Sequence, residues 1–186
     1  MTAALADTTI REVPPQSNRG PKIDRSLAFC GLQPGYAYCA AMVSLWLHGP
    51  VTITLAGREV HLPPVGSPTT ISPRARDFIN DQAIPARKVL QGRVTPQAGW
   101  LVVWRRGSSP LGHIGILLKV LGDNDFLVLE ANTGPGRTAG RTGGEGVHVR
   151  VRTIQPFAHF RIVAFVPVRY VPAGCDVHDP GREAAR

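Results

Sequence analysis

The chain has 186 residues, 43% of them apolar and 18% charged, which is typical of a single globular domain with its own core. Its formal net charge of +8 favours a polyanionic partner. The basic residues form short, separated pairs and only 6% of the chain is aromatic, so a nucleic-acid-binding platform is not expected. No apolar stretch approaches the roughly 20 residues that a membrane span needs.

The N-terminal residues and the cysteines bear on the cellular compartment. Residues 1–11 include Asp7 and lack the apolar core of a secretory signal, so we expect synthesis in the cytoplasm. The three cysteines (Cys30, Cys39 and Cys175) leave one over in any pairing, which argues against a disulfide framework. Cys30 reads as a small buried residue on a helix. No cysteine or histidine pair has zinc-ligand spacing, and no cofactor is expected.

The first part of the chain is predicted to be mainly helical. The predicted helices are a short one at Leu5–Val13, then Ile23–Phe29, Ala40–Leu47 and a modest one at Pro73–Asp81. Ala40–Leu47 is apolar on nearly every side and should be buried. Between these helices, Val51–Leu55 and Arg58–Leu62 alternate around Ala56-Gly57, as in a small hairpin.

Strands dominate the second part of the chain. The predicted strands are Trp100–Trp104, His113–Leu121, Asn124–Ala131, Gly146–Arg152 and Ile162–Val168. Short turns between them favour an antiparallel sheet of about five or six strands, so the fold class is α+β with N-terminal helices packed on the sheet. Residues 134–146 form a predicted Gly-rich loop, and residues 171–186 a predicted flexible tail.

Cys39 stands immediately before the most apolar predicted helix. A thiolate at a helix start is stabilised by the helix dipole and by free backbone N–H groups, so Cys39 is the candidate nucleophile. The alternative is that Cys39 is a small core residue packed beneath Tyr38 and Trp46.

His113 opens a strand, and its partner depends on strand register. If Gly122-Asp123 forms a two-residue turn, His113 lies opposite Asn132 and Gly115 opposite Glu130, which becomes a diagonal neighbour of His113 on the same face. A slip of one residue would turn these polar groups away from the histidine. The alternative for His113 is a hydrogen-bonded core histidine without a catalytic role.

These residues together predict cysteine-nucleophile chemistry. Cys39 would attack a carbonyl, His113 would accept and return the proton, and Asn132 or Glu130 would orient the imidazole. The Cys39 backbone N–H is a candidate oxyanion donor. Side-chain candidates for oxyanion or substrate contacts precede it in the chain: Gln33, Tyr36 and Tyr38.

Four segments in order resemble the CHAP-domain family of cysteine amidohydrolases and peptidases. They begin with Asn18-Arg-Gly-Pro-Lys-Ile-Asp24 and Gly31-Leu-Gln-Pro-Gly-Tyr-Ala-Tyr-Cys39-Ala-Ala-Met-Val-Ser44, and continue with Gly112-His-Ile-Gly-Ile116 and Glu130-Ala-Asn-Thr133. Residues 144–152 also resemble a stretch of phage-associated members.

The resemblance implies a papain-like fold, with Cys39 as nucleophile, His113 as base and Glu130 with Asn132 as orienting groups. It implies a catalytic domain at 18–170 with an inserted hairpin and loop at 50–72, preceded by an N-terminal extension at 1–17. Tyr38 replaces a common tryptophan, and the link Val51–Arg93 is longer than usual. The acidic calcium cluster of some members has no match, so no metal is expected.

The resemblance also implies a function, namely hydrolysis of amide bonds in bacterial peptidoglycan. The protein would act in the periplasm or cell wall, as a phage-type lysin or as a secreted antibacterial effector with a secretion machine and a cognate inhibitor protein. Two alternatives remain open: a papain-like hydrolase of soluble peptide amides, and a non-catalytic wall-binding module.

Overall fold

The computed structural model describes residues 2–48, 51–55, 58–62, 70–122, 124–134, 146–155 and 158–168. The helical elements are α1 (Thr2–Ala6), the 3₁₀ turn η1 (Asp7–Thr9), α2 (Pro21–Phe29), α3 (Cys39–His48), the 3₁₀ turn η2 (Ala75–Phe78) and α4 (Ala86–Leu90). The strands are β1 (Val51–Leu55), β2 (Arg58–Leu62), β3 (Ile84–Pro85), β4 (Leu101–Arg106), β5 (Gly112–Val120), β6 (Asp125–Thr133), β7 (Gly146–Thr153) and β8 (Phe160–Val166).

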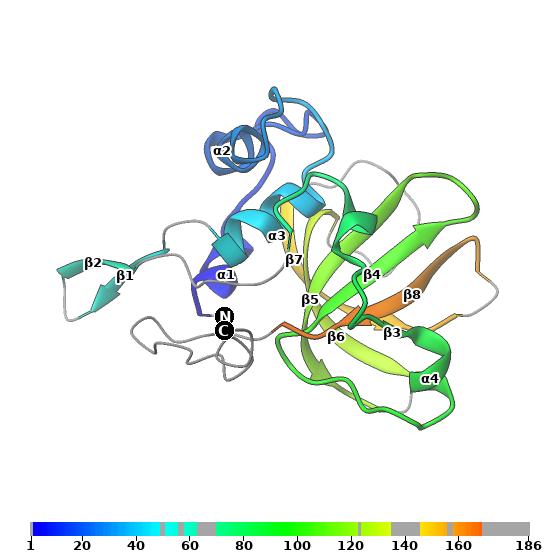
Figure 1. Cartoon of the computed structure of the whole chain (residues 1–186). Helices are drawn as coiled ribbons and strands as arrows, with labels where there is room; N and C mark the ends of the chain where they lie inside the picture. Colours follow the sequence, from blue (N-terminus) through cyan, green and yellow to red (C-terminus); the bar gives the residue numbers. More distant parts are fainter. Residues whose placement is uncertain are drawn as a thin grey trace, which may run out of the picture.

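The centre of the fold is a six-stranded antiparallel sheet with the order β3-β8-β4-β5-β6-β7. Figure 1 shows α1, α2 and α3 gathered on one side of this sheet, with the β1–β2 hairpin beyond α1 and away from the sheet. This arrangement confirms the predicted α+β, papain-like fold class. Within the described ranges, no helix combines the length and apolar character that crossing a membrane requires.

Helix α3 is the hydrophobic centre of the helical layer. Eight of its ten residues are buried, and it packs against α2, β5 and β6. A short chain segment this apolar is stable only when surrounded, and the sheet and α2 supply that cover. Helix α2 presents Ile23, Ser26 and Leu27 inward. The opposite sheet face carries a second cluster, in which Ala86 and Val89 of α4 take part.

Most predicted elements are confirmed, and the exceptions have local causes. The helix predicted at Pro73–Asp81 is only the 3₁₀ turn η2, in which Ala75 and Phe78 are the buried residues. The short elements β3 and α4 were not predicted. The helix predicted over Leu5–Val13 is wrong beyond Ala6, where α1 ends: a 3₁₀ turn and then an extended piece follow, and Val147 N donates to Ile10 O at 3.1 Å, so this piece is joined to β7. The predicted β1–β2 hairpin is confirmed, but its turn lies outside the described residues. Residues 135–145 of the predicted Gly-rich loop and the predicted tail also lie outside them.

The β5–β6 register is confirmed near its functional end, although the turn prediction is wrong. Gly115 pairs with Glu130 as predicted, but the loop is longer than two residues because Leu121 N donates to Asp125 O at 2.8 Å. The longer loop alone would move Glu130 opposite Ile116 and turn it to the other face. An irregularity between Leu117 and Lys119 restores the register.

Substitution of Gly115 tests how closely β5 and β6 pack at this point. A Cβ there would lie 2.7 Å from Leu129 O and 2.9 Å from Glu130 Cγ, so Gly115→Ala should lower the free energy of unfolding by about 1–3 kcal/mol. Gly122→Ala is the control, because nothing lies within 4 Å of its Cβ position. Urea unfolding measures both, and equal stability of the two variants would contradict the expected crowding.

Candidate active site

Cys39 is the first residue of α3, as predicted from the sequence. Met42 N donates to Tyr38 O at 2.8 Å, so the backbone N–H of Cys39 belongs to the helix start, where amides have no intrahelical acceptor. The Cys39 side chain is buried, with 7% of its surface exposed. Cys30 caps the C-terminus of α2 and is half-buried, and burial raises the pKa of its thiol although a hydrogen bond with Ser44 opposes this.

His113 lies in an aromatic setting near the start of β5. Its ring is 5.3 Å from the ring of Trp104, its partner on β4, and 6.1 Å from that of Phe160. It forms a hydrogen bond with Glu130, and Cys39 lies close enough to raise its pKa. Nε2 lies 2.8 Å from Glu130 Oε2, which leaves Nδ1 as the ring nitrogen for the thiol.

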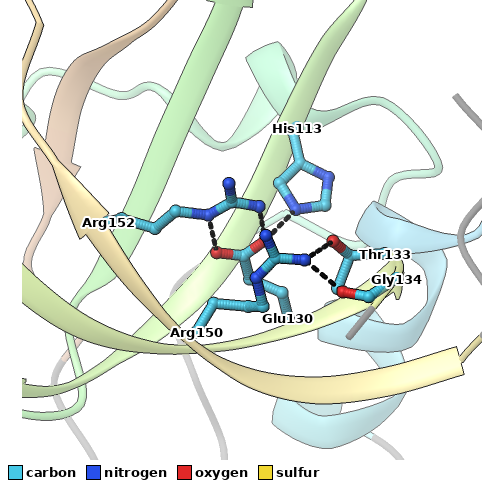
Figure 2. A network of polar contacts seen from close by, with 6 residues as sticks. All are labelled: His113, Glu130, Thr133, Gly134, Arg150 and Arg152. Carbon is cyan, nitrogen blue, oxygen red and sulfur yellow. Dashed lines mark hydrogen bonds and ion pairs between the residues drawn. The ribbon is translucent and has the colours of Figure 1, made fainter. Parts of the chain in front are cut away.

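Glu130 is completely buried and lies between His113 and Arg152 (Figure 2). Arg152 Nε donates to Oε1 at 2.6 Å, and one terminal guanidinium nitrogen donates to Oε2 at 2.5 Å. Both carboxylate oxygens are therefore engaged, and the oxygen that faces His113 also receives a hydrogen bond from Arg152. Such a buried charge is tolerated only because it is paired and hydrogen-bonded.

The pKa values of the pair follow from this geometry. Burial disfavours the imidazolium, but the hydrogen bonds with Cys39 and Glu130 and their charges outweigh it and raise the pKa of His113 to about 9. Burial likewise disfavours the carboxylate, but the hydrogen bonds from Arg152 and His113 and their charges lower the pKa of Glu130 to about 2. Glu130 is thus a carboxylate, and His113 is poised to carry a proton.

Arg150 lies beside this pair, but its side chain bonds to the end of β6 and not to Glu130. It donates to Thr133 Oγ1 at 3.3 Å and to the Gly134 carbonyl oxygen (Figure 2). Burial and the charge of Arg152 lower the pKa of Arg150, while Glu130 opposes this. Arg150 therefore secures the strand end that follows Glu130.

Glu130 contacts the imidazole, whereas the Asn132 side chain contacts Asn18. Asn132 adopts a left-handed backbone (φ 58°), and its side chain donates to Asn18 Oδ1 at 2.7 Å. It lies close enough to Tyr38 to affect the pKa of its hydroxyl, which donates to Glu12 Oε1 at 3.1 Å. Asn132 thus links the N-terminal segment and the residue preceding Cys39 to the end of β6.

The remaining predicted site residues are less defined. The Tyr38 side chain is fully buried and lies close to Glu12 and Asn132, so it packs beneath the backbone that leads into Cys39. Burial and the Glu12 carboxylate raise the pKa of the Tyr38 hydroxyl. Gln33 and Tyr36 are exposed, and their oxyanion or substrate contacts stay predictions. In the part of the chain that the structure describes, no three His, Cys, Asp or Glu side chains form a cluster suited to a metal ion.

Sequence reasoning missed Arg152, Trp104 and Phe160. The only sequence signal for Arg152 was its alternation with Arg150 along β7. That alternation predicts a shared face but not the partner. Arg152 is opposite Phe126 in the β6–β7 register and reaches back along β6 to Glu130.

The pair makes stability depend on pH in both directions. The folded-state pKa of His113 is raised from 6.5 to about 9, so its stabilisation is complete below pH 6.5 and is lost as the pH rises to about 9. That of Glu130 is lowered from 4.5 to about 2, so its stabilisation is lost as the pH falls from 4.5 to about 2. Urea unfolding across this range should show both losses.

His113→Asn supplies the control for the alkaline loss. The variant lacks the raised pKa, so its stability should change less between pH 6.5 and 9 than that of the wild type. An equal alkaline loss in both proteins would show that another group is responsible.

Comparison with known proteins agrees with the site. The family model of the CHAP domain matches residues 31–132, more than half of the chain, and this range includes Cys39, His113 and Glu130. Neither the curated proteins nor the solved structures give a significant match. Since the family model covers most of the chain, the protein belongs to the CHAP-domain family, whose members are usually amidase or peptidase hydrolases linked to peptidoglycan.

Proposed function

We propose that the protein is a cysteine hydrolase that cleaves an amide bond of bacterial peptidoglycan, as an N-acetylmuramoyl-L-alanine amidase or a peptide endopeptidase. The observation that carries this is the His113–Glu130 hydrogen bond beside Cys39 at the start of α3, where Cys39 is close enough to raise the pKa of His113. Nucleophile, base and orienting carboxylate are each within contact of the next, which is the arrangement that acyl transfer to a thiol requires.

Before the acylation half-reaction the proton of the Cys39 thiol has passed to His113, and Glu130 stabilises the resulting imidazolium. The sulfur electron pair forms a C–S bond to the amide carbon. The tetrahedral oxyanion then collapses, the C–N bond breaks and the imidazolium donates its proton to the leaving amine. The Cys39 backbone N–H at the helix start serves as one oxyanion donor.

In the deacylation half-reaction, His113 takes a proton from water, and the resulting nucleophile attacks the thioester carbon. The C–S bond breaks, the carboxylate product leaves and the proton returns to the sulfur. His113 must therefore accept and release a proton in each half-reaction, and its contacts on both sides hold it in one orientation for both.

An exposed basic surface near the site supports an anionic wall substrate. Arg105 and Arg161 are exposed and directly opposite each other on β4 and β8. Neither forms an ion pair with an acidic residue of the described ranges. Like charges directly opposite destabilise a sheet unless an anion offsets them. Arg105 also pairs with Gly112, the residue before His113.

The proposed setting is the bacterial cell wall, which the protein reaches from its own cytoplasm or from another cell. A phage-type lysin released through a membrane lesion and a secreted antibacterial effector both fit a basic hydrolase of this size. An effector would require a secretion machine and a cognate inhibitor protein in the producing cell.

Cys39→Ala tests the chemistry directly. Purified sacculi incubated with the wild type should release soluble fragments with new termini, whereas Cys39→Ala should release none because the acyl acceptor is gone. Mass spectrometry of the fragments names the bond. Cys30→Ala, which alters a thiol at the end of α2, should keep wild-type release.

The other outcomes point to the alternatives. Fragments released by a folded Cys39→Ala variant would overturn the cysteine mechanism. Cleavage of soluble peptides without digestion of sacculi would favour a hydrolase of peptide amides. Binding to sacculi with no release by the wild type would favour a non-catalytic module.

The raised pKa of His113 predicts the alkaline limb of activity. Because the imidazolium protonates the leaving amine, kcat/KM should fall above about pH 9. In Glu130→Gln, the carboxylate that raises the pKa of His113 is lost, so the alkaline limb should move to lower pH. An unmoved limb in folded Glu130→Gln would contradict this role of Glu130.

A further inference from the structure

Arg152 is the residue that fixes the plane of the Glu130 carboxylate. Its two donors contact both carboxylate oxygens, at 2.6 and 2.5 Å, in the paired geometry that defines orientation as well as charge. Glu130 Oε2 also contacts His113 Nε2 at 2.8 Å. The direction in which Glu130 presents this oxygen to the imidazole is therefore set by the guanidinium.

Arg152 is itself held by the aromatic group that holds His113. Its guanidinium carbon lies 5.7 Å from the centroid of the Trp104 ring, which is 5.3 Å from the His113 ring. Trp104 is in turn stacked with Phe160 at 6.5 Å and 12°. The contacts form a closed circuit from His113 through Glu130, Arg152 and Trp104 back to His113, so each member is in contact with two others.

The charges around Glu130 come from three elements. His113 on β5 and Arg152 on β7 contact it, Arg150 acts on it through its charge, and His148 is directly opposite it in the β6–β7 register. Cys39 on α3 reaches it through His113. The hydrogen bonds from Arg152 and His113 both favour the carboxylate.

We propose that Arg152 is a positioning residue for the reaction, holding the Glu130 carboxylate charged and in the one orientation that aligns the His113 imidazole with Cys39. This role rests on the proposed function. It goes beyond the family match, which ends at Asn132, twenty residues before Arg152. Arg152 does not contact the thiol or the reacting carbonyl; it acts through Glu130.

Three variants separate orientation, charge and stability. Arg152→Gln removes the cation and the paired donors. Arg152→Lys keeps the positive charge but lacks the planar pair of donors that contacts both carboxylate oxygens. Arg150→Gln removes a neighbouring buried cation that does not bond to Glu130. Circular dichroism and urea unfolding establish which variants fold.

The first readout needs no substrate. In ¹⁵N-histidine-labelled protein, the His113 Nε2 proton signal reports the hydrogen bond with Glu130, and a His148→Gln sample separates the His148 signals. We expect this signal to shift in Arg152→Gln and, by less, in Arg152→Lys, and to shift least in Arg150→Gln, because Arg150 acts on Glu130 through its charge and not through a hydrogen bond. If Arg152→Gln does not fold, a wild-type signal in Arg152→Lys overturns the proposal.

The second readout is the acid limb of kcat/KM on sacculi. Without Arg152, Glu130 should protonate at higher pH, so the midpoint of the acid limb should move up by at least about one pH unit in Arg152→Gln. The value of kcat/KM at neutral pH should fall about 100-fold because the imidazole is no longer aligned. If Arg152→Gln folds and neither its His113 Nε2 proton signal nor its acid limb moves, the positioning role is overturned and Arg152 has only a structural role. Shifted signals with a wild type inactive on sacculi would instead overturn the proposed function and leave the positioning role standing.

Discussion

The site depends on keeping one charge, the Glu130 carboxylate, where no water reaches it. An unpaired carboxylate in such a place would take up a proton, and it could then no longer stabilise an imidazolium. Arg152 and His113 prevent this by contacting both carboxylate oxygens. The three residues come from β5, β6 and β7. Glu130 can therefore stay ionised only when these strands pair in the observed register. A change in either register would separate the charges and cost about 3–5 kcal/mol, the usual penalty for an orphaned buried partner.

Two irregularities in β6 and its neighbours adapt the regular sheet to this constraint. The one between Leu117 and Lys119 compensates for a long loop and returns Glu130 to the face of His113. At the one between Ala131 and Thr133, Asn132 has a left-handed conformation and is left out of the pairing with β7. Asn132 then contacts Tyr38 and Asn18. Bulges are common next to active sites because they redirect single side chains without breaking the sheet, and here they give Glu130 and Asn132 different tasks.

The helical layer supplies the other half of the site. Cys39 is held by a helix that is buried on nearly all sides and by Tyr38, whose hydroxyl is tied to Glu12. Glu12 also accepts a hydrogen bond from Asn18 N at 3.2 Å. The segment before α2 therefore takes part in positioning the thiol. Asp7 extends this attachment, since Trp46 of α3 donates to it at 2.8 Å and Lys22 of α2 at 2.5 Å.

The sequence by itself determined what depends on neighbours along the chain. The start of α3 at Cys39, the strand that carries His113 and the α+β class follow from apolar periodicity and turn residues, which act over a few positions. The tertiary structure decided what depends on distant pairing. The sequence correctly placed Glu130 opposite Gly115, but by an unpredicted bulge that cancelled an incorrectly short turn. The contact of Glu130 with His113 depends on the pairing of β5 with β6, and its contact with Arg152, 22 residues further on, on the pairing of β6 with β7, because side-chain direction along a strand defines a face and not a partner.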